Sequence, residues 1–283
     1  MAVGMAGNDV RRAGRQAAGH PLFHRLSRAG LAAKGVIYLL IGLLAVQIGL
    51  GDTGEEADKS GALQTVADKP GGTVVLWLLV IGFAGLALWR YAESAYGQPG
   101  PDGRKATKRL ASLARAVFYT VSCLAILAFV LGQGTSSSDD QSKEFTAKAM
   151  AEPGGRWLVL AVGLGFVGWG VGNIVNAARR KFLDKLNTGQ MSSRTRKTVK
   201  VLGIVGRSAR GLVFGAVGVF LAHSAITFDP DKAKGVDGTL REFADTPAGP
   251  WALVAVALGL VTYGLYTFCE ARWRKIEVVR SGR

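Results

Sequence analysis

Polar residues recur at corresponding positions in successive apolar segments of this sequence. If the segments are neighbouring helices, these side chains could pair with one another. The first apolar segment of each pair begins at a lysine or arginine, and the second ends at a glutamate or asparagine. At a helical rise of about 1.5 Å per residue, these positions lie roughly 25 to 30 Å from the far ends of their helices. Pairing would lower the cost of a charge at the hydrocarbon edge. The predicted contacts are Lys34 with Glu93, Arg115 with Asn176, and Arg210 with Glu270.

An aromatic side chain follows each of these cations by four residues, which places both on one face of a helix. The aromatic residues are Tyr38, Tyr119 and Phe214. Cations and aromatic rings are common at the headgroup level of a membrane, where they anchor a helix. Anchoring is therefore the alternative to pairing across helices.

Two further polar residues, Gln47 and His223, lie inside apolar segments, towards the end opposite the cations. Each follows the cation of its own segment, Lys34 or Arg210, by 13 residues. At about 100° per residue, the cation and the later polar residue face nearly opposite sides of a straight helix. They cannot line one continuous conduit, which weakens a transporter interpretation. We expect interhelical hydrogen bonds at Gln47 and His223, while any polar residue inside a membrane is also a candidate functional site.

The sequence contains no recognisable catalytic constellation. A P-loop, a GxSxG motif, HExxH, zinc-ligand spacing and a dinucleotide fingerprint are all absent from it. The two cysteines, Cys123 and Cys269, have no CxxC spacing and are interpreted as small buried hydrophobic residues. We therefore predict that the protein is not an enzyme and has no catalytic residue, cofactor or metal site.

Six runs without a charged residue predict six transmembrane helices. A spanning helix needs about 20 mostly apolar residues, and 49% of this chain is hydrophobic. The first run is short, and reaches spanning length if its helix begins near Ala29 and includes Lys34, whose stem can snorkel to the interface. The runs are Gly35–Leu50, Pro70–Trp89, Ala116–Ser138, Trp157–Ala178, Gly211–Phe228 and Thr246–Cys269.

The distribution of charge orients these helices. A net charge of +15 would by itself suggest nucleic acid or an anionic surface as a partner. One side of the predicted helices holds 27 Lys and Arg against 6 Asp and Glu, however, whereas the other side holds 8 against 14. This positive-inside pattern places the basic side, with both termini, in the cytoplasm. Anionic lipid headgroups then account for the basic loops, and no nucleic-acid binding is expected.

Three markers recur in the same order along the chain: a cation at a helix start, an acid and a proline at a loop end, and a glycine inside the second helix (Gly82, Gly165 and Gly259). The distance from cation to proline is 36, 38 and 37 residues. Such self-similarity indicates internal repeats, and because each unit returns to the same side the repeats are parallel. We predict an all-α integral membrane protein with six transmembrane helices as three parallel tandem helical hairpins.

The predicted divisions follow from these markers. They are a basic cytoplasmic N-terminal segment (1–22), repeat 1 (23–98), a cytoplasmic linker (99–108), repeat 2 (109–182), a basic cytoplasmic linker (183–198), repeat 3 (199–276) and a cytoplasmic tail (277–283). Whether the three hairpins close into a ring or form an arc is left open by the sequence.

The helix starts and loop ends carry a family resemblance. Lys34-Gly35-Val36-Ile37-Tyr38 and Asp68-Lys69-Pro70-Gly71 represent the two motifs, and the second repeat departs from them with Ala116 in place of the glycine. Over about residues 23–276 the chain resembles a family of bacterial membrane proteins called domain of unknown function 1206. The resemblance implies a membrane location and three copies of a two-helix unit, and it implies no activity.

Each outer loop contains a short apolar pattern before its proline, exemplified by Leu63, Phe145 and Leu240. We expect a short amphipathic segment on the outer membrane surface there, with a partner-binding cap as the alternative. The helix centres are rich in glycine and nearly without ionisable groups, which favours close packing over a polar pathway.

These features together predict a non-catalytic scaffold or accessory subunit of the bacterial plasma membrane, with another membrane protein as partner. The alternative is a small-solute or ion transporter or channel, with a pathway between the hairpins.

Overall fold

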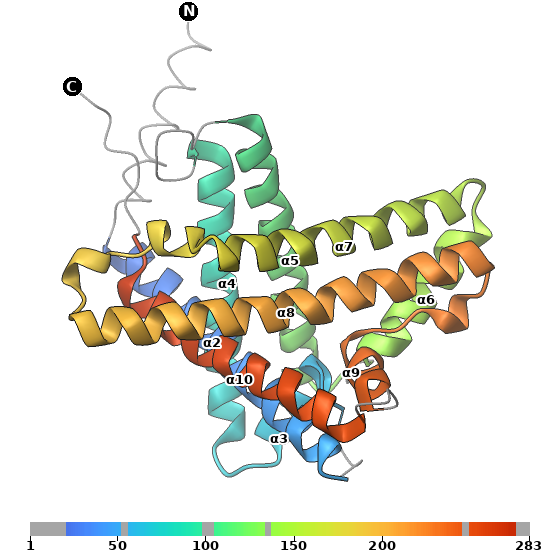
Figure 1. Ribbon diagram of the computed structural model, residues 1–283, viewed down its shortest axis with the longest axis horizontal. Helices are drawn as coiled ribbons and strands as arrows, with labels where there is room; N and C mark the ends of the chain where they lie inside the picture. Colours follow the sequence, from blue (N-terminus) through green and yellow to red (C-terminus); the bar gives the residue numbers. More distant parts are fainter. Residues whose placement is uncertain (1–20, 52–55, 98–104, 134–136, 245–248, 276–283) are drawn as a thin grey trace, which may run out of the picture. The chain divides into compact units, whose positions relative to one another are not determined.

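The computed structural model describes residues 21–51, 56–97, 105–133, 137–244 and 249–275 of the chain, and these form helices and no β-strand (Figure 1). Six of the helices are long and apolar enough to cross a membrane. They are α2 (Pro21–Gly49), α4 (Gly72–Tyr96), α5 (Ala106–Val130), α7 (Gly155–Ala178), α8 (Ser193–Thr227) and α10 (Gly249–Trp273). The predicted all-α membrane fold is confirmed. Most of the predicted N-terminal segment, and all of the predicted tail, lie outside the described residues.

Shorter helices connect the long ones. A helix interrupts each of the three loops predicted to be outer: α3 (Lys59–Ala67), α6 (Ser138–Ala151) and α9 (Val236–Ala244), the last preceded by η3 (Pro230–Lys232). Between α7 and α8 lie η1 (Lys181–Lys185) and η2 (Thr188–Gln190). The apolar sides of α3 and α9 face the protein, because Leu63 and Leu240 are 0% exposed. The expectation that these segments lie on the membrane surface stays a prediction. The apolar residue named for it is buried in α3 and α9, whereas Phe145 of α6 is 50% exposed.

The recurring proline and glycine form the turn that starts the second helix of a repeat. In the first two repeats, the amide N–H of Gly72 donates to Lys69 O over 2.8 Å and that of Gly155 to Glu152 O over 2.9 Å. The glycine that follows each proline has a φ of +80°, which a side chain disfavours. The motif is thus a tight turn, and its third copy at Pro247 lies outside the described residues.

The described chain divides into two compact units, which we treat separately. Unit 1 comprises Met1–Lys34, Thr73–Gln133 and Phe268–Arg283, and unit 2 comprises Gly35–Gly72 and Gly134–Thr267. Each unit holds residues from all three repeats. Helices α2 and α10 contribute residues to both units.

Unit 1 is built around α4, which packs on the start of α2 and along α5 (Figure 1). A Cβ atom on Gly82 would lie 2.8 Å from the Cβ of Ala33, so α2 and α4 approach closely there. Between α4 and α5, the rings of Phe83 and Tyr119 meet edge to face at 6.1 Å. Small residues and ring contacts supply the packing that lipid does not favour through hydrophobicity.

Glycines bring the long helices of unit 2 equally close. A Cβ on Gly163 of α7 would lie 2.7 Å from the backbone nitrogen of Ala222 on α8, and one on Gly264 of α10 would lie 2.9 Å from Gly35 O on α2. Helix α10 also packs on α8, where Gly259 meets Ala209. Because α10 contacts α2 within unit 2, the third repeat touches the first. This contact is one that a ring of repeats requires.

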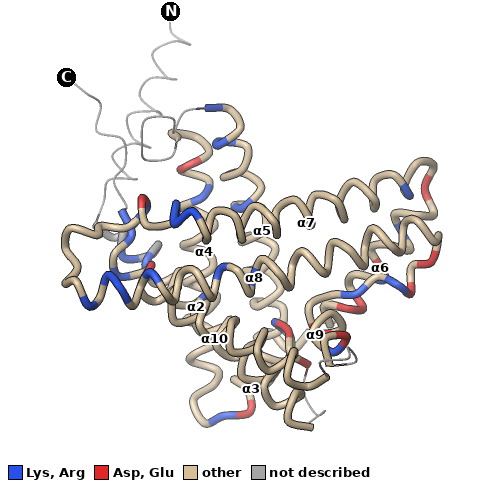
Figure 2. Tube along the Cα trace, viewed as in Figure 1, with Lys and Arg blue, Asp and Glu red and all other residues tan. Residues whose placement is uncertain are grey.

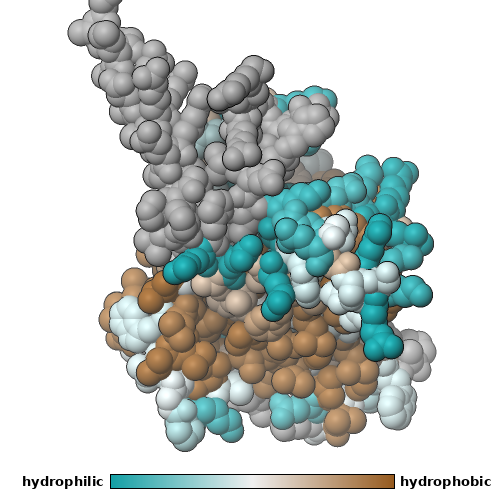
Figure 3. All heavy atoms as spheres, turned by 90° about the vertical axis from the view of Figure 1, so that its left-hand side faces the viewer, coloured by the Kyte–Doolittle hydropathy of each residue, from teal (hydrophilic) through white to brown (hydrophobic). Residues whose placement is uncertain are grey.

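Charged residues are confined to particular stretches of the helices. Figure 2 shows most of α7 without charge, whereas Lys and Arg residues lie along the first half of α8. Figure 3 shows a hydrophobic area with hydrophilic side chains gathered apart from it. Large apolar side chains, such as Leu50 at 71% and Trp251 at 76%, are exposed. This distribution is expected of a protein whose apolar surface contacts lipid.

Candidate functional site

The short helices of unit 2 begin with side chains that accept hydrogen bonds from free backbone N–H groups. The carboxylate of Asp58 accepts from the amides of Ser60 at 2.7 Å and Gly61 at 3.1 Å, and the hydroxyl of Ser137 accepts from the amide of Asp140 at 3.0 Å. The first amides of a helix have no partner within it, and aspartate and serine are the usual N-cap residues. The loop sequences thus define the helix starts locally.

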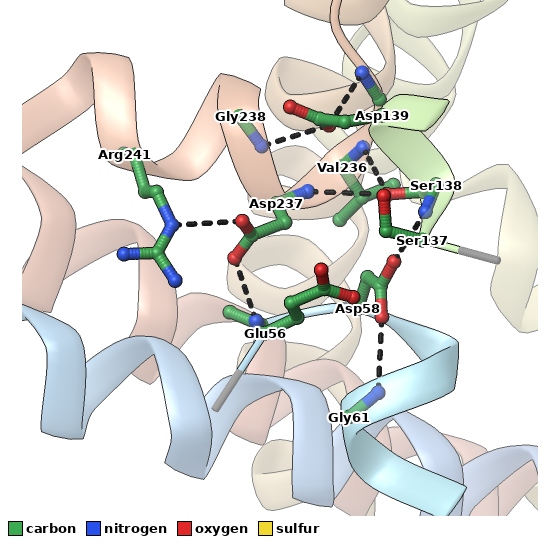
Figure 4. Close-up of polar contacts among 12 residues, drawn as sticks. Glu56, Asp58, Gly61, Ser137, Ser138, Asp139, Val236, Asp237, Gly238 and Arg241 are labelled. Atoms are coloured by element: carbon green, nitrogen blue, oxygen red, sulfur yellow. Dashed lines mark hydrogen bonds and ion pairs between the residues drawn. The ribbon is translucent and has the colours of Figure 1, made fainter. Parts of the chain in front are cut away.

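Further hydrogen bonds connect the three loops to one another (Figure 4). Asp58 Oδ2 of the first loop accepts from the amide of Ser138 at 2.6 Å, and Ser138 Oγ accepts from the amide of Val236 at 3.0 Å. Asp237 Oδ1 of the third loop accepts from the amide of Ala57 at 2.7 Å. The series runs from the first loop to the second, the third and back to the first. We call residues 56–61, 137–139 and 235–241 the loop cap.

The loop cap is tightly fitted where the second and third loops meet. Asp139 Oδ1 accepts from the amides of Gly235 at 2.8 Å and Gly238 at 3.0 Å. A Cβ on either glycine would collide, with Ser138 in one case and the Asp139 carboxylate in the other. The other carboxylate oxygen of Asp237 pairs with Arg241 Nε at 2.7 Å. These acids therefore serve as acceptors for backbone amides and for one arginine.

The pKa of Glu56, in the loop cap, is displaced upward. Burial raises its pKa above the ordinary 4.5, and the negative charges of Asp58, Asp237 and Asp140 add to the rise, while a hydrogen bond from Ser60 Oγ opposes it. The neighbouring Lys59 has its pKa lowered by burial, against the attraction of Asp58. In the part of the chain that the structure describes, no three His, Cys, Asp or Glu residues are grouped to hold a metal ion.

The guanidinium of Arg210 lies among four aromatic rings in unit 2, which we call the aromatic cage. Its Cζ is 4.5 Å from the ring centroid of Trp169, 5.1 Å from Phe214, 5.2 Å from Tyr263 and 5.4 Å from Tyr38. Its Nε donates to the hydroxyl of Tyr38 over 2.7 Å. The rings come from α2, α7, α8 and α10. Because ring faces attract cations, the aromatic cage stabilises a charge between apolar helices.

A second group of polar residues lies in unit 1, near the ends of α4 and α10 and on α5. We call Arg90, Glu93, Ser112, Arg115, Glu270 and Arg274 the charge cluster. Arg90 Nη1 donates to Glu93 Oε2 over 2.6 Å, and Ser112 Oγ donates to the same oxygen over 3.2 Å. Arg274, one residue past the end of α10, pairs with Glu270. Five of the six residues are at most 7% exposed, namely Arg90, Glu93, Ser112, Glu270 and Arg274.

Two arginines of the charge cluster contact one aromatic ring. The Cζ of Arg90 is 4.5 Å from the ring centroid of Trp89, and that of Arg274 is 4.3 Å from it. The buried Nε of Arg90 has no hydrogen-bond partner among the described residues. Arg115, half-buried on α5, has Arg90 and Arg274 as repulsive electrostatic neighbours and Glu93 as an attractive one.

The residues predicted to pair across hairpins have other contacts in the structure. Glu93 bonds with Arg90, Glu270 with Arg274, and Arg210 with Tyr38. Asn176 is exposed on α7, and Lys34 lies in unit 1. The three predicted pairings stay predictions. Arg210 contacts Phe214 of its own helix, as its spacing predicts, and three further rings from other helices. Membrane anchoring by this pair stays a prediction.

Gln47 and His223 are both exposed in unit 2, near the ends of α2 and α8. Their predicted interhelical hydrogen bonds stay predictions as well. Sequence reasoning missed Asp58, Ser138 and Asp237, although an acid or a serine at the start of a short helix is a recognised signal.

Comparison with known proteins agrees with the repeat architecture. The family described as Domain of Unknown Function (DUF1206) matches residues 29–97, 110–180 and 205–274. The chain is 34% identical over 252 residues to the uncharacterized protein YxxB of Bacillus subtilis (strain 168), a similarity that covers 88% of this chain and 90% of that protein. No solved structure matches it. Three consecutive matches confirm three tandem repeats, and the chain belongs to the DUF1206 family.

Proposed function

We propose that the protein is a non-catalytic scaffold or accessory subunit of the bacterial plasma membrane. Both termini and the basic loops face the cytoplasm, where anionic headgroups contact them, and the three short helices face outward. Another membrane protein is its partner. The protein performs no reaction of its own and needs no cofactor.

The observation that carries this proposal is the closed series of hydrogen bonds in the loop cap. The acidic side chains Asp58, Asp139 and Asp237 would be the natural groups to attract a cation at the mouth of a pathway. They accept instead from backbone amides of other loops. An arrangement that ties three repeats together at one end suits a rigid support, since opening it would leave buried amides unpaired.

A transporter or channel is the second candidate, and the charge cluster favours it. Buried ionisable residues inside membrane helices often mark a path for ions or protons. Arg90, Glu93 and Glu270 meet that description at the ends of α4 and α10. Their pairing with neighbours three or four residues along the chain also suits a purely structural role, so we place transport second.

Two measurements on the full chain separate these functions. Purification from native bacterial membranes, with the tag at either terminus, should recover a membrane protein in fixed ratio. Proteoliposomes made from the same sample should show no flux of protons, alkali ions or small solutes above that of empty vesicles. Flux that appears without any stoichiometric partner would overturn the scaffold and establish the transporter. The Asp58→Ala variant, compared with Asp68→Ala at the exposed end of α3, should lose the partner selectively.

Topology needs a separate test. Reporter fusions at both termini should give cytoplasmic signals, and fusions within residues 52–55, 134–136 and 245–248 should give external ones. An external signal from the N-terminus would contradict the orientation derived from the charges.

A further inference from the structure

The charge cluster contains three arginines and two glutamates. Glu93 is bonded to Arg90 and Glu270 to Arg274, which leaves Arg115 as the third arginine beside two glutamates. Within the described residues, Arg115 makes no hydrogen bond or ion pair, and two of its electrostatic neighbours are arginines. A half-buried guanidinium in such surroundings retains five N–H donors that need acceptors.

A second, independent feature is the unused donor on Arg90. This side chain is 7% exposed, yet its Nε has no acceptor in the described part of the chain. Its Nη1 is occupied by Glu93, and its planar group rests on the ring of Trp89. Buried donors without a partner are rare in folded proteins, and an unseen bound group is one reason for them.

The position of these residues relative to the predicted membrane boundary indicates which chemical group could bind to them. Arg90 follows directly on the charge-free run Pro70–Trp89, and Arg115 directly precedes the run Ala116–Ser138. Glu270 likewise follows directly on the charge-free run Thr246–Cys269. The boundary between hydrocarbon and water is where the phosphate groups of lipids lie. Arginine is the side chain best suited to a phosphate, since its fork of donors matches the oxygens.

We propose that Arg115, together with the free donor of Arg90 and the charge of Arg274, binds one phosphate group at the basic end of unit 1. The group belongs to an anionic lipid headgroup or to free phosphate. Glu93 and Glu270 do not contact it, and instead hold Arg90 and Arg274 in place. This site does not depend on whether the protein is a scaffold or a transporter.

The test uses the full chain purified in a maltoside detergent, which carries no phosphate. Thermal unfolding is followed while phosphatidylglycerol, phosphatidylcholine or inorganic phosphate is added, with potassium chloride as the control for ionic strength. Phosphatidylglycerol should raise the unfolding temperature in a saturable manner, and more than phosphatidylcholine does. An equal rise with inorganic phosphate identifies free phosphate as the ligand, whereas a rise with phosphatidylglycerol alone identifies the lipid.

Matched variants distinguish a site from general attraction to a basic surface. Arg115→Gln should increase the half-saturating concentration about tenfold or more. Arg109→Gln removes the same charge from an exposed position of the same helix, and should change it less than about twofold. Arg272→Gln is the matching exposed control on α10. The proposal is overturned if phosphatidylglycerol and inorganic phosphate both act no more strongly than the chloride control, or if Arg115→Gln and Arg109→Gln weaken binding equally.

Discussion

Arg115 in unit 1 and Arg210 in unit 2 occupy equivalent positions of the second and third repeats, yet their surroundings differ. Arg210 is enclosed by four aromatic rings and bonded to Tyr38. Arg115 has two arginines among its electrostatic neighbours. The same repeat position therefore places an arginine near the hydrocarbon in two different environments, one aromatic and one charged.

The difference follows from the helix that precedes each arginine in the chain. Counted from the repeated glycines, the position of Trp169 on α7 is held by Leu86 on α4, and the position of Asn173 is held by Arg90. The third repeat's arginine thus gains a ring, whereas the second repeat's gains a like charge. The two repeats thus share their helices, while different residues on the preceding helix give the repeated arginine a structural role in one repeat and a proposed binding role in the other.

The largest effect is expected for Glu93→Gln in the charge cluster. The change leaves Arg90 and Arg274 buried with less negative charge nearby, and breaking a buried ion pair costs about 3–5 kcal/mol. Thermal or denaturant unfolding in detergent measures the loss. Glu144→Gln is the control, because its pair with Lys148 is exposed and such pairs contribute about 0–1 kcal/mol. Equal losses for the two variants would show that Glu93 does not hold the cluster together.

The next effect is expected in the loop cap, for Asp58→Ala. It removes a helix cap, at about 1 kcal/mol, and leaves the amide of Ser138 without an acceptor, at about 1–3 kcal/mol. Hydrogen exchange should rise at the starts of both α3 and α6. Asp58→Asn, which keeps one acceptor oxygen, should recover part of the protection. If exchange rises in α3 alone, the first and second loops are not joined through this residue.

A smaller effect is expected when the aromatic cage is made to resemble the surroundings of Arg115. Trp169→Leu introduces the residue that α4 has at that position, and should destabilise the protein by about 0.5–2 kcal/mol. Trp251→Leu serves as the control, since Trp251 is 76% exposed. If Trp169→Leu lowers the free energy of unfolding no more than Trp251→Leu does, the aromatic cage does not explain the difference between Arg210 and Arg115.

The smallest effect concerns the pH dependence of the loop cap. The pKa of Glu56 is raised in the folded protein, so its contribution to stability is complete below the ordinary pKa of 4.5 and is lost as pH rises through the raised value. Glu56→Gln stays neutral, and should be more stable than the parent at neutral pH and equal to it in acid. Unfolding temperatures between acidic and neutral pH measure this. A difference that does not vary with pH would exclude titration of Glu56.

Hydropathy predicted the six helices because spanning length and apolar character are local properties of the sequence. It predicted their ends less well. Helix α8 begins at Ser193, well before the charge-free run at Gly211, because lysine and arginine are good helix formers outside lipid. Helix α5 ends at Val130 although its charge-free run continues to Ser138, and Gly132 has a φ of +79° just after it.

The site was less accessible to sequence reasoning, for two physical reasons. From the sequence, the acidic residues of the loops indicated only which side of the membrane the loops face. In the structure, Asp58 and Asp237 are buried and accept hydrogen bonds from backbone amides of loops far away in the sequence. Glu93 and Glu270 were predicted to pair across hairpins with Lys34 and Arg210, and those pairings stay predictions. Both glutamates also have an arginine partner three or four residues away along the chain. That spacing is visible in the sequence. The aromatic cage is not, because it joins four separate helices.

The contrast between the two arginines is tested most directly by comparing Arg210→Gln with Arg115→Gln in a detergent without phosphate. Arg210→Gln removes the interactions with four rings and the bond to Tyr38, and should lower the free energy of unfolding by about 2 kcal/mol or more. Arg115→Gln removes a half-buried cation beside two like charges, and should leave that free energy unchanged or raise it. A loss on Arg115→Gln as large as the loss on Arg210→Gln would contradict the account.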